Sequence, residues 1–149
     1  MIQYKKENAK GVKSMDINLD NLFKEARKAA DEAYAPYSKF RVGAALLCSD
    51  GTVITGANVE NRSYGLTICA ERSAVVKAIS MGLRSFIAIA ISTPDSKIPV
   101  GPCGACRQVL SEFMDPSAPV IFGGSSDEKI KTTMGILYPH DSLHDLAIA

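Results

Sequence analysis

A chain of 149 residues is long enough for one domain that buries roughly 68–70% of the surface its unfolded form exposes. Hydrophobic residues make up 46% and charged residues 22%, a composition typical of a globular protein rather than of an intrinsically disordered one. A formal net charge of +1 without a long basic run argues against a nucleic-acid partner. No apolar run reaches the ~18 residues of a membrane span, and the polar N-terminus resembles no signal peptide, so we expect a cytoplasmic protein.

The chain divides into a short extension and one folded domain. Residues 1–15 are charged and show no periodicity, which indicates a disordered or loosely attached extension. The remainder, residues 16–149, forms the domain. Apolar residues recur at helical spacing from Leu19 to Ala33, and Asn18 is the expected N-cap.

The middle of the chain predicts a hairpin, a helix and a buried strand. Phe40–Cys48 is an apolar strand-like run, and the turn at Ser49–Gly51 joins it to a second strand at Thr52–Ala57, as in an antiparallel hairpin. A helix is expected from Cys69 to a stop at Gly82. The continuous apolar run Phe86–Ile91 is typical of a strand that is buried on both faces.

The last part of the chain predicts a third helix and two further strands. The helix follows Cys103 and ends before Pro116, and the strands are expected at Pro119–Phe122 and Lys129–Leu137. Helices that alternate with apolar strands favour parallel βαβ units. We therefore expect an α/β domain with a mixed sheet of about five strands and helices packed on its faces.

Two cysteine clusters carry the chemistry of this sequence. They are Cys69-Ala70-Glu71 and Cys103-Gly104-Ala105-Cys106. Three thiols at this spacing supply three ligands to a Zn²⁺ ion and leave a fourth position open for water, as in a catalytic site. Both clusters lie at predicted helix N-termini, where the partial positive charge favours thiolate over thiol. Glu71 lies close enough to the first ligand to handle the proton of that water.

The cysteines allow two other interpretations. A lone C-x-x-C is also typical of a thioredoxin-like redox pair or of half a structural zinc ribbon. The redox pair does not account for Cys69 and Glu71, and the ribbon needs a fourth ligand that Cys48, inside an apolar strand pattern, does not supply. His140 and His144 share helical spacing, but we do not expect a second metal site on this polar segment.

Four segments together resemble the small zinc-dependent cytidine deaminases. They are residues 37–46 (YSKFRVGAAL), 58–61 (NVEN), 69–72 (CAER) and 102–110 (PCGACRQVL), and the resemblance extends over about residues 19–146. It implies a three-layer α/β/α fold with a mixed five-stranded sheet and helices on both faces. It also implies a homotetramer in which each pocket is completed by residues of other subunits.

The resemblance implies zinc-dependent hydrolytic deamination of cytidine and deoxycytidine in pyrimidine salvage, with ammonia as the second product. Cys69, Cys103 and Cys106 would bind one zinc ion per chain, and Glu71 would transfer the protons. The alternatives are a deaminase of a related cytosine-bearing nucleoside and a non-catalytic zinc-stabilised interaction module. Glu71 and the open coordination position argue against the second alternative.

The resemblance also assigns the substrate contacts. Asn58 and Glu60, two residues apart on one face of an extended segment, would bind the ribose. Phe40 would stack on the base, and the Ala70 backbone N–H would bind the pyrimidine edge. Arg72 would hydrogen-bond the ligand thiolates and offset their charge. The alternatives are an ordinary Asx-type loop for Asn58, strand core for Phe40 and a surface ion pair for Arg72.

The remaining candidates are weaker. Arg107 directly follows a ligand and could also offset the thiolate charge, and Tyr64 could border the pocket or a subunit contact. The C-terminal segment departs from the family, because it lacks the aromatic residue that closes over a neighbouring subunit's substrate. Tyr138 and Leu143 are the bulky candidates there, and we expect Leu143 to take the place of that lid.

Overall fold

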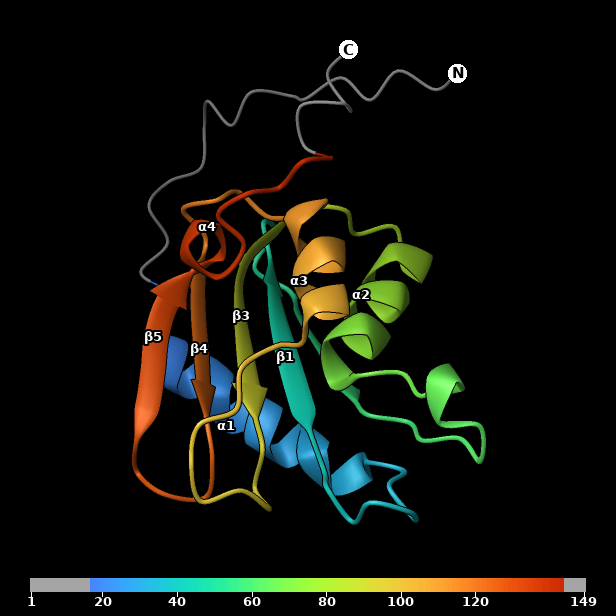
Figure 1. Cartoon of the computed structure of the whole chain (residues 1–149). Coiled ribbons are helices and arrows are strands. Elements are labelled where there is room, and N and C mark those ends of the chain that lie inside the picture. The colour runs from blue at the N-terminus through green and yellow to red at the C-terminus, as the bar shows by residue number, and fades with distance from the viewer. Residues whose placement is uncertain (1–16, 144–149) are drawn as a thin grey trace.

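A mixed five-stranded sheet forms the centre of the computed structural model, which describes residues 17–143 (Figure 1). The strand order is β2-β1-β3-β4-β5; β3 and β4 are parallel, and the other neighbouring strands are antiparallel. The strands are β1 (Gly43–Cys48), β2 (Val53–Ala57), β3 (Phe86–Ser92), β4 (Pro119–Gly123) and β5 (Lys129–Thr133). The predicted sheet and hairpin are confirmed.

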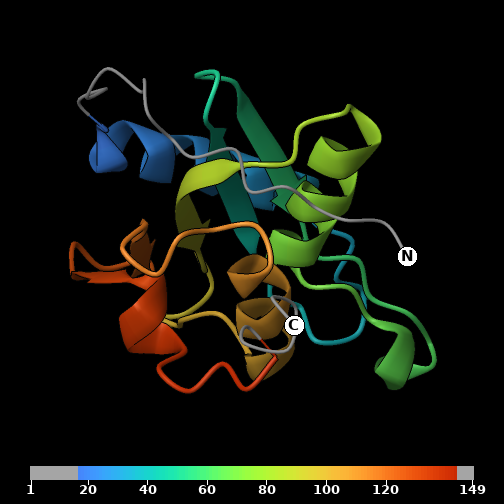
Figure 2. The ribbon, with the colours of Figure 1, turned by 90° about the horizontal axis from the view of Figure 1, so that it is seen from above.

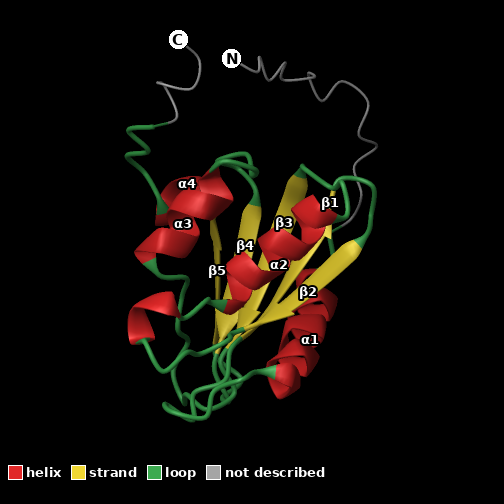
Figure 3. Cartoon of the chain, turned by 90° about the vertical axis from the view of Figure 1, so that its right-hand side faces the viewer, coloured by secondary structure: helices red, strands yellow, loops and turns green. Residues whose placement is uncertain are grey.

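Helices cover both faces of the sheet, which gives the predicted three layers (Figure 3). One face carries α1 and the other carries α2 and α3, and the view from above shows the same arrangement (Figure 2). The helices are α1 (Leu19–Ala29, continued by a 3₁₀ turn at Ala30–Glu32), α2 (Ala70–Ser80), α3 (Gly104–Ser111) and α4 (Met134–Leu137), and a further 3₁₀ turn spans Tyr64–Leu66. No helix within residues 17–143 combines the length and the apolar character needed to cross a membrane.

Small residues let α1 lie directly on the sheet. Asn18 caps the helix, since its Oδ1 accepts a hydrogen bond of 3.0 Å from the Asn21 amide. A side chain at Gly43 would meet the Ala26 carbonyl at 2.0 Å, so only glycine permits this approach. Leu22 and Phe23 then pack in the cluster that alanines of β1 and β3 complete.

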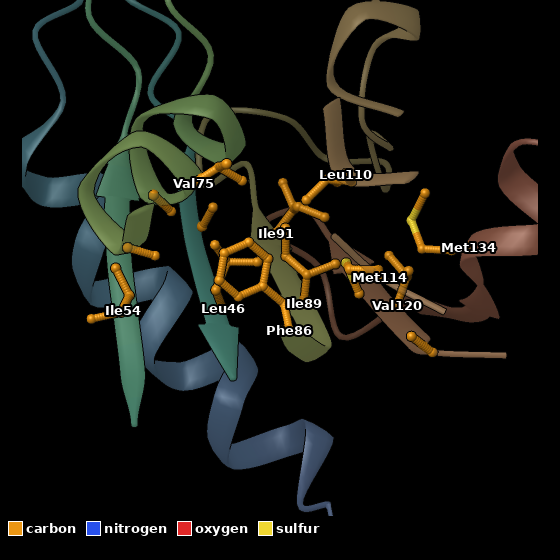
Figure 4. Close-up of a cluster of buried hydrophobic side chains, with 14 of the residues drawn as sticks. Leu46, Ile54, Val75, Phe86, Ile89, Ile91, Leu110, Met114, Val120 and Met134 are labelled. Carbon is orange, nitrogen blue, oxygen red and sulfur yellow. The ribbon is translucent and has the colours of Figure 1, made fainter. Parts of the chain in front are cut away.

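The larger core lies between the sheet and the α2–α3 layer (Figure 4). Ile89 and Ile91 point to this face of β3 because they are two residues apart in a strand. Each fully buried aliphatic side chain contributes ~1.5–3 kcal/mol relative to an exposed one. Further members include Leu46, Ile54, Val75, Phe86, Leu110, Val120 and Met134. This packing fixes α2 and α3 beside each other, with their N-termini at the same end of the layer (Figure 1).

The structure corrects the predicted boundaries of two strands. The last strand ends at Thr133 rather than Leu137, because the Thr133 hydroxyl accepts from the Ile136 amide and starts the short helix α4, whose Met134 enters the core. The first strand begins at Gly43 rather than Phe40. The predicted extension at residues 1–15 and His144 lie outside the described residues.

Candidate active site

Three cysteines meet where α2 and α3 begin. Cys69 is the N-cap of α2, Cys103 is the N-cap of α3, and Cys106 lies in the first turn of α3. Their sulfur atoms all lie within 4.8 Å of one another, and the Sγ atoms of Cys69 and Cys103 are 3.8 Å apart. Cys48 lies instead in the hydrophobic core, as its sequence context predicts.

Hydrogen bonds link the thiols to one another and to Arg72. The Cys106 thiol lowers the pKa of Cys69 to about 5 by hydrogen-bonding its thiolate, and Arg72 adds to the effect. The same interaction, together with burial, raises the pKa of Cys106. The Arg72 Nη2 atom donates to the Cys69 sulfur over 3.6 Å and to the Thr67 carbonyl over 3.3 Å. The structure thus places Arg72 on a thiolate, and within residues 17–143 no carboxylate forms an ion pair with it.

Glu71 is a buried carboxyl in the first turn of α2. Its side chain is 3% exposed, and Oε2 has no hydrogen-bond partner in the described part of the chain. Burial raises the pKa of Glu71 to about 7, and the nearby Cys69 thiolate acts in the same direction. A carboxyl with a pKa near neutrality exchanges protons in both directions at the pH of a cell.

The donor set suits a zinc ion. Three sulfur donors on two rigid helix ends supply ligands that Zn²⁺ accepts, and three protein ligands leave one position for water. The orphaned carboxylate oxygen of Glu71 lies on the same turn as Cys69 and can serve as the proton acceptor. Ala70, between them, is fully buried and has its N–H in the first turn of α2, where such groups lack a partner within the helix.

Asn58 supports the backbone around Phe40. Its side chain is 7% exposed; Oδ1 accepts from the Val42 amide over 2.8 Å, and Nδ2 donates to the Phe40 carbonyl over 2.9 Å. The Val42 carbonyl still accepts from the Asn58 amide over 3.1 Å, but the Val42 amide bonds to the Asn58 side chain instead of its carbonyl, so the regular strand β1 begins at Gly43. Phe40 itself is half-buried, so its side chain is not part of the strand core.

Glu60 closes the turn that precedes Phe40. Its carboxylate accepts hydrogen bonds from the Tyr37 amide (2.9 Å), from the Ser38 amide (3.3 Å) and from the Ser38 hydroxyl. The hydroxyl contact, followed by the two amide contacts, lowers the pKa of Glu60 and keeps it ionised. No local pattern pointed to Ser38, because its partner Glu60 lies 22 residues away.

The other candidates lie away from the thiols or on the surface. Arg107 donates to the carbonyls of Pro102 (2.8 Å) and Leu137 (2.9 Å) rather than to a ligand sulfur. The Tyr138 hydroxyl donates to Gln108 over 2.6 Å and ties the C-terminal segment to α3. Two exposed candidates are Tyr64, whose ring lies 6.1 Å from that of Tyr37, and Leu143.

Comparison with known proteins agrees with this geometry. Residues 17–122 match the family described as the cytidine and deoxycytidylate deaminase zinc-binding region. The cytidine deaminase of Sporosarcina psychrophila is 49% identical over 83% of this chain and 90% of its own, and that of Halalkalibacterium halodurans is 52% identical over 79% and 89%. The crystal structure of the cytidine deaminase from Burkholderia pseudomallei superposes with a TM-score of 0.78 at 44% identity, covering 83% of this chain and 98% of that one. The chain therefore belongs to the cytidine deaminase family of zinc enzymes.

Proposed function

We propose that this enzyme hydrolyses cytidine and deoxycytidine to uridine and deoxyuridine with release of ammonia. The observation that carries the proposal is the buried carboxyl of Glu71, with its unpartnered oxygen, next to the three-thiol cluster. Cys69, Cys103 and Cys106 would hold one zinc ion per chain, and the ion would lower the pKa of a bound water molecule toward neutrality.

Glu71 moves the protons of the reaction. It takes one proton from the attacking water, whose oxygen adds to C4 of the cytosine ring, and it delivers that proton to N3. It then passes the second water proton to the 4-amino group. The C4–N bond breaks, ammonia leaves and the C4 carbonyl of uracil forms. One carboxyl acts as base and then as acid, which requires a pKa close to the working pH, and burial provides it.

Arg72 offsets the charge of the ligands. Three thiolates around a divalent cation leave a net charge of −1, which weakens the cation as a Lewis acid. The guanidinium hydrogen bond to Cys69 withdraws part of that negative charge.

The substrate lies between residues 39–42, the Phe40 segment, and the start of α2. Phe40 stacks on the base, and the Ala70 N–H binds the pyrimidine edge. Asn58 and Glu60 bind the ribose; within residues 17–143 Asn58 Nδ2 donates once, to Phe40, which leaves its second N–H for a sugar hydroxyl. A sugar hydroxyl at Glu60 competes with Ser38 for the carboxylate.

The assembly and cellular role complete the proposal. The enzyme acts in the cytoplasm, in pyrimidine salvage, as a homotetramer in which Leu143 covers the substrate of a neighbouring subunit. Exposed apolar side chains on the loop that leads to Cys69 support self-association, among them Val59 (47% exposed), Tyr64 (74%) and Leu66 (66%). Free nucleosides as substrates fit a net charge near zero.

One assay tests the activity and its alternatives. Purified zinc-loaded protein is mixed with cytidine, deoxycytidine, deoxycytidylate or a cytosine-bearing nucleoside antibiotic, and the cytosine absorbance and ammonia are followed. We expect turnover of the two plain nucleosides and none by Glu71→Gln. Preference for the antibiotic or the nucleotide would show that the enzyme acts on that compound rather than on the plain nucleosides. Full zinc content without ammonia release would identify a non-catalytic zinc module.

A further inference from the structure

Arg41 and Asp95 form a multiple contact between two segments that are 54 residues apart in the sequence. The Asp95 carboxylate accepts from the backbone amide of Arg41 (2.8 Å), from Nε (3.0 Å) and from Nη2 (2.8 Å). The remaining guanidinium nitrogen, Nη1, reaches Asp31 at 3.3 Å. A planar guanidinium held at two nitrogens has a fixed orientation, unlike a single lysine contact.

The contact joins the Phe40 segment to the loop that precedes α3. Arg41 directly follows Phe40, and Asp95 lies between β3 and α3, eight residues before Cys103. That loop is itself anchored, because the Ser96 carbonyl accepts from the amide (2.6 Å) and the hydroxyl (2.9 Å) of Ser125, just beyond β4. Asp95 is therefore a fixed point against which Phe40 can be placed.

The Phe40 segment depends on such external contacts. Three consecutive amides bond to side chains rather than to a strand: Phe40 to Ser38 Oγ (3.0 Å), Arg41 to Asp95 and Val42 to Asn58. Lys39, just before them, has a φ of 59°, a region that non-glycine residues seldom adopt. Conformations of this kind persist where surrounding contacts impose them.

We infer that Arg41 and Asp95 are a positioning pair, which we call the clamp. It holds Phe40 at the distance from the N-termini of α2 and α3 that cytidine needs. The inference deepens the proposed function and rests on it. Within residues 17–143 no hydrogen bond or ion pair joins either side chain to α2 or to a ligand cysteine, so the clamp acts on substrate binding and leaves zinc and Glu71 in place. Arg41 keeps the pKa of Asp95 at about 2, so that both partners stay charged throughout the neutral range.

Steady-state kinetics on cytidine with Arg41→Gln, Arg41→Lys, Asp95→Ala and the double variant Arg41→Gln/Asp95→Ala test the clamp. An ion pair of this exposure is worth up to ~1 kcal/mol, so KM should rise about three- to fivefold in Arg41→Gln and Asp95→Ala. Arg41→Lys should fall between these variants and the parent. The double variant should come close to Asp95→Ala, because Asp95→Ala already removes the shared interaction and leaves the Arg41 side chain only its exposed 3.3 Å contact to Asp31. We expect kcat and zinc content to stay at parent values and Tm to fall by no more than about 4 °C, the shift that ~1 kcal/mol produces in a domain of this size.

Asp20→Asn is the matched control. It removes exposed ion pairs from Asp20 on α1 to Lys129 (3.5 Å) and Lys131 (3.4 Å) on β5, far from Phe40 in the sheet order, and should leave KM unchanged. Unchanged KM in Arg41→Gln and Asp95→Ala, or strictly additive effects, would overturn the clamp while the proposed function stands. A fall in kcat together with zinc loss, or with a drop in Tm well beyond about 4 °C, already in Arg41→Lys, would show a structural role instead and equally overturn it. A parent protein inactive on cytidine would overturn both proposals.

Discussion

Replacing Glu71 with glutamine preserves the volume of the side chain and removes its ability to exchange a proton. A general acid–base step contributes ~10²–10⁴-fold, and Glu71 serves more than one step, so we expect kcat to fall by about 10⁴-fold. This loss corresponds to ~5.5 kcal/mol of activation free energy. Zinc content and affinity for uridine should stay unchanged, because neither depends on the proton.

The same substitution should raise the free energy of unfolding. Burial raises the pKa of Glu71 from 4.5 to about 7, so an ionised carboxylate costs the folded state up to about 3 kcal/mol. Below pH ~4.5 the group is protonated in both states and the cost is absent; it grows as the pH rises toward ~7 and is constant above. Glutamine does not titrate, so the free energy of unfolding of Glu71→Gln should exceed that of the parent by a margin that grows as the pH rises from ~4.5 to ~7. A bound cation reduces the margin, which makes 3 kcal/mol an upper limit.

Three measurements check this reasoning. They are the initial rate of cytidine loss, zinc content, and urea unfolding at about pH 5.5 and pH 8. Glu112→Gln is the matched control, because Glu112 is an exposed carboxylate at the C-terminal end of α3, away from the cysteines at its N-terminus. Activity of Glu71→Gln within tenfold of the parent would refute the role of Glu71 as proton carrier. A variant less stable than the parent at pH 8 would refute the stated cost of its burial.

Three further predictions concern the metal, its charge and the lid. Cys48→Ala should retain zinc and most activity, whereas Cys103→Ala should lose both, as atomic absorption and turnover would show; zinc loss in Cys48→Ala would contradict the ligand assignment. Arg72→Ala should move the pH–rate profile to higher pH, because the hydrogen bond to the Cys69 thiolate is lost; an unchanged profile with zinc bound would reduce Arg72 to a structural residue. Leu143→Ala should raise KM and Leu143→Phe lower it, since a stacked ring adds ~0.5–1.5 kcal/mol; equal KM values would show that this segment does not cover the pocket.

The sequence by itself was sufficient to predict the metal cluster and the elements that hold it. Cys103 and Cys106 are one helical turn apart, and Cys69 and Cys103 cap helices whose apolar periodicity is visible in the chain. The spacing of Cys103 and Cys106 is local, so three-dimensional packing has little freedom to change it, whereas Cys69, 34 residues before Cys103, joins them because α2 packs beside α3. The hairpin was predictable for the same reason, because a short turn joins two apolar runs.

Only the tertiary structure decided the surroundings of the cluster. The apolar run from Phe40 predicted strand, but the amides of Val42 and Arg41 bond to the side chains of Asn58 and Asp95, and the regular strand begins only at Gly43. Arg107 turned from the thiols to two backbone carbonyls. In each case the partner lies in another segment or in the backbone, and periodicity within one segment carries no record of it. Hydrogen bonds between distant segments set the backbone around Phe40.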